Sequence, residues 1–92
     1  MIIGSGFLGS GESQYVDVTL IAGHNYRVYA QPEDQTVDFD LYIYDEHGNL
    51  VRWDETLNAD AYAAIQPAWS GPFRVVVKAA RGSSRFAVAI YE

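Results

Sequence analysis

The stretch that decides the fold is residues 38–54, which read DFDLYIYDEHGNLVRWD. Its first half carries apolar residues at alternate positions, namely Phe39, Leu41 and Ile43. Such alternation is typical of a β-strand that turns one face to the core. Asp45 and Gly48 stand at the first and fourth positions of a turn, a spacing that favours a type I turn followed by a glycine bulge. The stretch therefore predicts a β-hairpin.

Counting outward from the turn gives the expected register of this hairpin. If Asp45 pairs with Asn49, then Leu41 faces Trp53. A slip by one residue would turn Trp53 to solvent and bring Arg52 inside. The unslipped register places an entirely apolar set on the inner face, namely Phe39, Leu41, Ile43, Val51 and Trp53. We therefore expect Trp53 to be buried against Leu41.

Period-two alternation recurs along most of the chain, and turn signals rich in Gly, Pro, Asn and Asp separate the runs. Seven or eight short strands at this spacing predict an all-β fold, a jelly-roll-like antiparallel β-sandwich. Ninety-two residues suit one domain. Residues 1–12, rich in Gly and Ser, are expected to form a lead-in or linker with a short strand at Phe7–Leu8. Residues 13–92 are expected to form the sandwich, including a short strand around residues 62–65.

Composition limits the classes of function. Twelve acidic against six basic residues give a net charge of -6, which argues against nucleic acid or an anionic membrane as partner. The absence of cysteine excludes disulfides, thiolate zinc sites and a cysteine nucleophile. The two histidines cannot form a three-histidine metal site, and both stand in predicted turns. We therefore expect a protein without catalytic activity.

One glycine motif matches a dinucleotide-binding pattern but has a simpler interpretation. Gly4–Gly9 matches G-x-G-x-x-G, but a dinucleotide site needs a helix after the last glycine, and a strand pattern follows here. We interpret the motif as part of the Gly/Ser-rich lead-in.

An acidic edge is the candidate metal site. In the predicted register Asp38, Asp40 and Asp54 share the outward face, and Asp40 lies opposite Asp54. Like charges so paired destabilise a sheet unless something neutralises them. Oxygen ligands without histidine suit calcium. The alternatives are a solvated acidic edge and a salt-bridge network with Arg74 or Arg81.

Outward tyrosines are the candidate binding residues. Tyr42 and Tyr44 share a strand face with Arg52 across from them, and Tyr29 is assigned to a further strand. Tyrosine beside arginine makes a good contact surface, because the ring offers a large area at low entropy cost. The alternative is that tyrosine simply favours half-exposed positions of a sheet.

Three segments carry a family resemblance: residues 15–28 (YVDVTLIAGHNYRV), 38–51 (DFDLYIYDEHGNLV) and 71–77 (GPFRVVV). Together they span about Gly11 to Tyr91, and the sequence resembles the bacterial pre-peptidase C-terminal domain family, relatives of the collagen-binding domains of clostridial collagenases. The resemblance implies a non-catalytic jelly-roll-like sandwich appended to exported peptidases and other hydrolases. It also implies a role in secretion or attachment to substrate, with calcium or collagen as ligands of some members.

The expected function is therefore that of an accessory or adhesion module, with a collagen-like protein or a polysaccharide as partner. A module of this kind is secreted as part of a longer protein. One alternative is a free-standing cytoplasmic β-sandwich that forms oligomers through its tyrosine-rich face. Another is a carbohydrate-binding module that stacks sugars on the same aromatic side chains.

Overall fold

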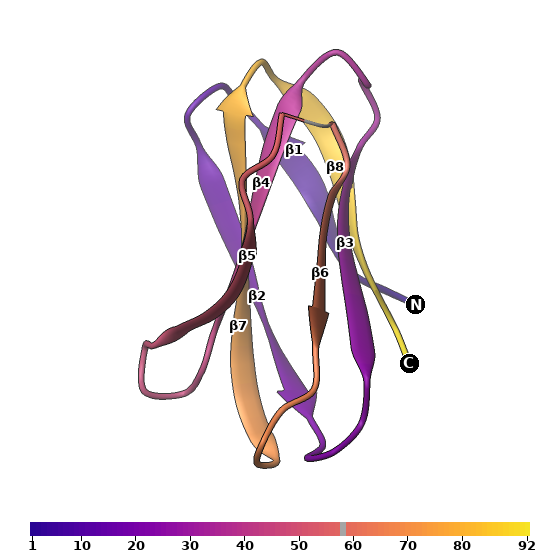
Figure 1. The fold of residues 1–92 in the computed structure, drawn as a ribbon. Helices are drawn as coiled ribbons and strands as arrows, with labels where there is room; N and C mark the ends of the chain where they lie inside the picture. The colour runs from indigo at the N-terminus through magenta and orange to yellow at the C-terminus, as the bar shows by residue number, and fades with distance from the viewer. Residues whose placement is uncertain (58) are drawn as a thin grey trace.

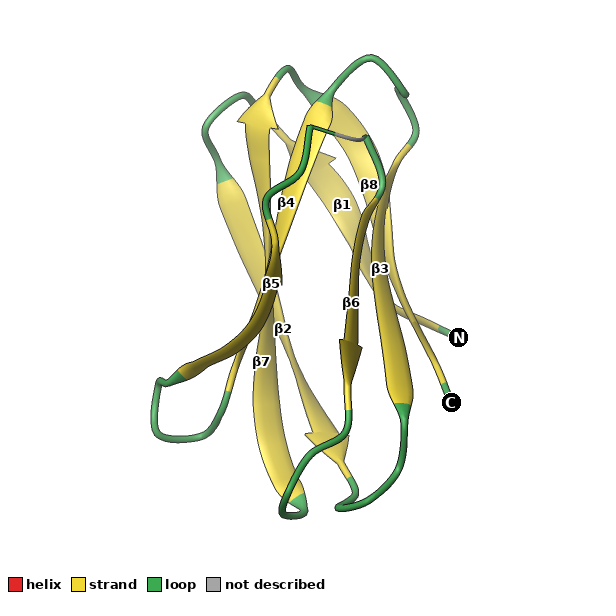
Figure 2. Ribbon diagram, in the orientation of Figure 1, coloured by secondary structure: helices red, strands yellow, loops and turns green. Residues whose placement is uncertain are grey.

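Over residues 1–57 and 59–92, which the computed structural model describes, the chain forms eight β-strands and no helix (Figures 1 and 2). Accordingly, this part of the chain contains no helix long and apolar enough to cross a membrane. The strands are β1 (Ile2–Leu8), β2 (Ser13–Leu20), β3 (Tyr26–Pro32), β4 (Asp38–Tyr44), β5 (Leu50–Asp54), β6 (Ala61–Ile65), β7 (Gly71–Arg81) and β8 (Ser84–Tyr91).

The strands form two facing sheets (Figure 1). Sheet A has the order β1-β8-β3-β6 and sheet B the order β2-β7-β4-β5, and neighbouring strands are antiparallel. The pairs β1–β8, β2–β7, β3–β6 and β4–β5 are those of one long hairpin wrapped into two sheets, which is the jelly-roll arrangement. The predicted antiparallel β-sandwich is confirmed.

The core lies between the inner faces of the two sheets. Phe39 of sheet B and Phe86 of sheet A meet there with ring centroids 5.8 Å apart. Phe39, Leu41 and Ile43 are fully buried, as their alternation predicts. Burial of such side chains is the main favourable term in the folding of a domain this small.

The first twelve residues contain a strand longer than the two-residue strand that the sequence predicts. β1 pairs with β8 from Ile2 opposite Ala89 to Leu8 opposite Ser84, and the Leu8 side chain is buried in the core. Gly and Ser favour flexibility in a free linker. Here the backbone pairing with β8 and the burial of Leu8 fix them in an edge strand.

The predicted turn of the β4–β5 hairpin is present. The Asp45 amide donates to the Asn49 carbonyl at 2.9 Å, and the Gly48 amide donates to the Asp45 carbonyl at 3.1 Å. Gly48 has a φ of +81°, a left-handed conformation that favours glycine. Tyr44 then pairs with Leu50, as predicted.

Beyond this pair the predicted register is wrong. Ile43 pairs with Arg52, which leaves Val51 as the extra residue of a β-bulge. Trp53 therefore lies opposite Tyr42, and its side chain is 56% exposed on the outer face instead of packed on Leu41. A bulge reverses the alternation of the strand. The edge strand β5 tolerates the reversal, because a long side chain such as Arg52 reaches water past the sheet edge.

Candidate functional site

The structure divides the four predicted binding residues between two faces of the sandwich. Tyr42 and Tyr44 lie on the outer face of sheet B, whereas Tyr29 lies on the outer face of sheet A. Arg52 shares neither face, because the bulge turns it to the inner side of β5, where its Nη1 donates to the Val51 carbonyl at 2.8 Å. These residues therefore do not form one surface.

Polar groups on the outer face of sheet B are largely paired within the protein. Arg74 makes a two-point ion pair with Asp17, with Nε 2.9 Å from Oδ1 and Nη2 3.2 Å from Oδ2. Its guanidinium carbon also lies 3.9 Å from the centroid of the Tyr15 ring. The Tyr42 hydroxyl donates to Glu55 Oε2 at 2.8 Å, and burial followed by this carboxylate holds the pKa of Tyr42 well above its usual range.

One hollow of the described surface also lies on sheet B. It has a volume of about 630 Å³ and is lined by Tyr44, Arg74 and Val76, with Asp17 and Glu46 beside them. The one cationic group in this lining is already held by Asp17. A ligand in this hollow would have to compete with that internal pair for Arg74.

The predicted acidic edge is only partly assembled. Asp38 and Asp40 are neighbours on β4, both are buried, and the Oδ1 atom of each has no hydrogen-bond partner among the described residues. On β5, Asp54 lies opposite Leu41, so the predicted pairing of Asp40 with Asp54 is wrong. On the other side of β4, Asp40 lies opposite Lys78 of β7. Burial, then Asp38 and Glu55, raise the pKa of Asp40 above its ordinary value.

Asp54 has a structural contact of its own. Its carboxylate accepts hydrogen bonds from the backbone amides of Thr56 at 2.9 Å and Tyr62 at 2.8 Å, so it ties the edge of sheet B to β6 of sheet A. Burial works to raise the pKa of Asp54, but these hydrogen bonds lower it below the ordinary value. Within residues 1–57 and 59–92, no three His, Asp or Glu side chains are arranged to hold a metal ion.

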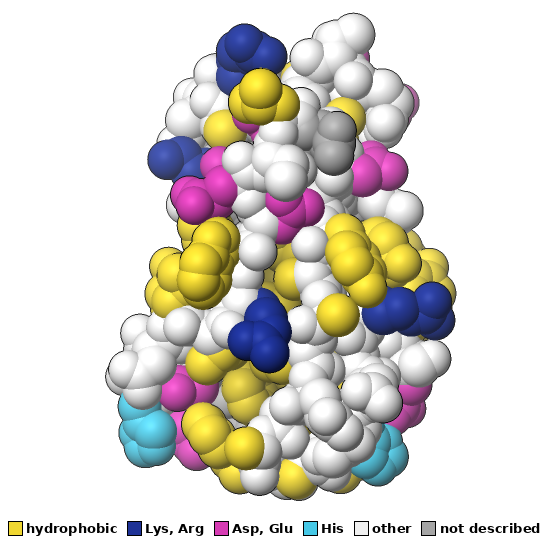
Figure 3. All heavy atoms as spheres, in the orientation of Figure 1, with side chains coloured by type: hydrophobic (Ala, Val, Ile, Leu, Met, Phe, Trp, Pro, Cys, Tyr) yellow, Lys and Arg dark blue, Asp and Glu magenta, His cyan; other side chains and the backbone are white. Residues whose placement is uncertain are grey.

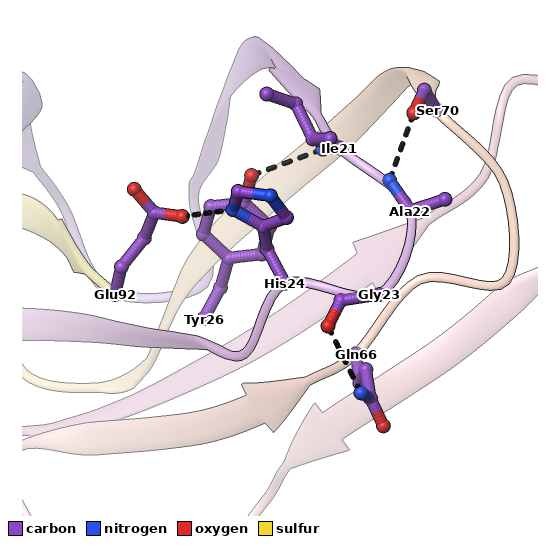
Figure 4. Close-up of polar contacts among 8 residues, drawn as sticks. All are labelled: Ile21, Ala22, Gly23, His24, Tyr26, Gln66, Ser70 and Glu92. Carbon is purple, nitrogen blue, oxygen red and sulfur yellow. Dashed lines mark hydrogen bonds and ion pairs between the residues drawn. The ribbon is translucent and has the colours of Figure 1, made fainter.

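Both histidines lie in turns, as predicted. His24 Nδ1 contacts Glu92 Oε1, and the Tyr26 hydroxyl accepts a hydrogen bond from the Ile21 amide at 3.0 Å (Figure 4). The same turn is tied to the β6–β7 loop, because Gln66 Nε2 donates to the Gly23 carbonyl at 3.0 Å. These contacts fix the turn between β2 and β3 at one end of the sandwich.

An aromatic cluster occupies the outer face of sheet A. Tyr29 on β3 lies opposite Tyr62 on β6, with ring centroids 5.0 Å apart and ring planes at 41°. Tyr91 on β8 approaches Tyr29 from the other side, with centroids 5.8 Å apart and planes at 69°. In Figure 3, hydrophobic side chains gather over β6 and β3 with basic side chains beside them. We name Tyr29, Tyr62 and Tyr91 the tyrosine cluster.

The outward positions of sheet A differ in charge from the rest of the molecule. In the described strands of this sheet, Arg27 and Arg85 are the charged residues at those positions, and no carboxylate accompanies them. Arg27 lies directly opposite Tyr91, and Arg85 lies directly opposite the exposed Phe7. Each arginine therefore has an aromatic side chain as its cross-strand neighbour.

Arg85 also adjoins open space. A hollow of about 450 Å³ is lined by Ser5, Gly6, Phe7, Arg85 and Phe86. It lies at the β1–β8 end of the same face, away from the tyrosine cluster. The outer face of sheet A thus combines a packed aromatic surface with a second aromatic–arginine pair beside a hollow.

Sequence reasoning found Tyr29 but missed Tyr62, Tyr91 and Arg27. The signal was available in the alternation, because each stands at an outward position of its strand. What the sequence lacks is the strand order β8-β3-β6, which brings the three strands together. Comparison with known proteins adds no assignment: no protein-family model matches the chain, and no curated protein sequence matches it. The resemblance to the pre-peptidase C-terminal family therefore stays a prediction.

Proposed function

We propose that this chain is a non-catalytic binding module that attaches to a polymer through the outer face of sheet A. The observation that carries the proposal is the tyrosine cluster, in which Tyr62 and Tyr91 each pack on Tyr29 and are themselves 42% and 44% exposed. Aromatic side chains with an apolar face and a polar hydroxyl are favoured at binding surfaces. Arg27 beside them adds hydrogen-bond donors.

The shape of the site supports an extended ligand. The rings lie on an open sheet face, whereas small molecules are usually held in concave sites that bury most of their surface. The ring planes are inclined by 41° and 69°, so they cannot all lie flat against one planar surface. A single polysaccharide chain, whose sugar rings turn relative to one another, fits inclined rings better than a crystalline surface does.

Binding to soluble polymers tests this proposal. Affinity electrophoresis against neutral and acidic polysaccharides and gelatin should reveal retardation by at least one polymer. Tyr62→Ala should weaken that binding by about tenfold or more, which is typical of an aromatic residue that contributes strongly to a binding surface. The matched control is Trp53→Ala, since Trp53 is at least as exposed but lies on sheet B.

Two results would overturn the proposal. One is unchanged binding by the Tyr62→Ala variant with loss of binding by Trp53→Ala, which would place the site on sheet B. The other is a concentration-dependent dimer in sedimentation experiments that Tyr62→Ala dissociates, because the tyrosine cluster would then be an interface between copies of the chain.

A further inference from the structure

We propose that the polymer is an acidic polysaccharide whose sugar rings stack on the tyrosine cluster and whose carboxylates pair with Arg27 and Arg85. This inference rests on the proposed function and names its ligand class. It follows from the distribution of charge over the molecule, the availability of the two arginines and their spacing along β8.

The charge on the outer face of sheet A is opposite to that of the whole chain. With Arg27 and Arg85 on this face, four basic and twelve acidic residues remain for the rest of the protein. The acidic residues of the sheet B strands lie across the apolar core from a ligand on sheet A. Carboxylates that border this face include those of Glu33, whose amide donates to the Arg85 carbonyl at 2.8 Å, and of Glu92, which contacts His24.

Both arginines are available to a ligand. Neither Arg27 nor Arg85 has a carboxylate within 4.0 Å among the described residues, in contrast to Arg74, which is paired with Asp17. Both side chains are exposed. The planar guanidinium matches a carboxylate with two parallel hydrogen bonds, so each arginine offers a complete site for one carboxylate.

The spacing of the two arginines requires an oligomeric ligand. Arg85 and Tyr91, the cross-strand neighbour of Arg27, stand six residues apart on β8, which corresponds to about 20 Å along the strand. One sugar cannot span this distance, but a chain lying along β8 can contact both aromatic–arginine pairs. The hollow beside Phe7 and Arg85 leaves room for a sugar at the far end.

The tyrosine cluster favours a polysaccharide over an acidic polypeptide as the ligand. The apolar faces of sugar rings can cover the three tyrosine rings, whereas the acidic side chains of a polypeptide would leave these rings without a partner. Nucleic acid also offers rings for stacking, but its dense phosphate charge needs many basic contacts, and this face supplies two.

The test uses one polymer backbone with and without its charge. Binding of the intact chain to polygalacturonate and to its fully methyl-esterified form is compared at 0.15 M salt. We expect the acidic form to bind at least about tenfold more tightly, because charge-assisted hydrogen bonds are lost on esterification. Arg27→Gln and Arg85→Gln should each weaken binding of the acidic form by about tenfold and weaken binding of the ester much less. The monosaccharide should not compete.

Arg52→Gln is the control variant, because it changes the net charge equally and lies on sheet B. Circular dichroism melting checks that each variant is folded. Equal binding of the acid and the ester would overturn this inference and leave the proposed function standing. Equal binding of polyglutamate or single-stranded DNA would overturn it in favour of that class of polymer. If the chain binds none of these polymers and none of the polysaccharides or gelatin used to test the proposed function, the proposed function is overturned as well.

Discussion

Tyr42 on β4 lies directly opposite Trp53 on β5, and the two side chains share the outer face of sheet B. The indole is therefore a surface group supported by one cross-strand neighbour. Its energetic role differs from that of Leu41, which stands one residue before Tyr42 and is fully buried.

Replacing Trp53 by alanine should therefore change the free energy of unfolding little. We expect a loss of less than about 1 kcal/mol, since a cross-strand aromatic pair on an exposed face contributes no more than that. Urea denaturation followed by circular dichroism measures the change. A loss of 3 kcal/mol or more, which is typical of a buried tryptophan, would contradict the exposed position of Trp53.

Leu41→Ala should be far more damaging. Removing a fully buried leucine costs about 2–5 kcal/mol, out of roughly 5–14 kcal/mol expected for a domain of this length. The same denaturation experiment applies. Leu50→Ala is the matched control, because Leu50 is 42% exposed on β5 and should cost much less. Equal losses for the two variants would show that the core is not centred on β4.

Asp40 should make the protein less stable as the pH rises. Burial and the neighbouring carboxylates of Asp38 and Glu55 raise the pKa of Asp40, so the folded state binds more protons than the unfolded state. The stability is thus greatest below the unfolded pKa of aspartate and is lost as the pH rises through the folded pKa. Asp40→Asn should be more stable than the wild type at pH 7. It should also lack this part of the pH dependence in thermal melts between pH 3.5 and pH 7, whereas identical pH profiles would refute the assignment.

Calcium should leave the melting temperature unchanged. The hypothesis of a calcium site at Asp38, Asp40 and Asp54 needs three carboxylates together, and Asp54 is instead engaged with the amides of Thr56 and Tyr62. Thermal melts in EDTA and in millimolar calcium at pH 7.5 provide the measurement. A stabilisation that calcium produces and that Asp40→Asn abolishes would restore the calcium hypothesis.

Gly82→Ala should destabilise the protein more than Gly48→Ala. Both glycines have a positive φ, near +81° at Gly48 and +85° at Gly82, and a left-handed alanine costs about 1–2 kcal/mol. A Cβ atom at Gly48 meets nothing within 4 Å, but at Gly82 it would lie 2.6 Å from Cγ1 of Val37. The shift of Val37 that removes this overlap should add about 1–3 kcal/mol to the loss of unfolding free energy. Equal free energies of unfolding for the two variants would mean that Val37 moves aside freely.

Local patterns in the sequence determined the elements of this fold. The alternation at Phe39, Leu41 and Ile43 predicts which side chains β4 buries, because successive side chains of a strand point to opposite faces and one face packs on the core. The spacing of Asp45 and Gly48 predicts the turn, because it depends on the φ and ψ angles of a few neighbouring residues. Both predictions concern interactions within one hairpin, and both are confirmed.

The tertiary structure alone decided where β5 shifts register and which tyrosines meet. Val51 and Trp53 are apolar and fit an inner face in sequence, but the bulge and the edge position of β5 place Trp53 outside. Tyr29, Tyr62 and Tyr91 are separated by about thirty residues each along the chain, and the strand order β8-β3-β6 brings them together. Strand order results from the burial of all inner faces at once, a global condition that no local pattern of residues contains.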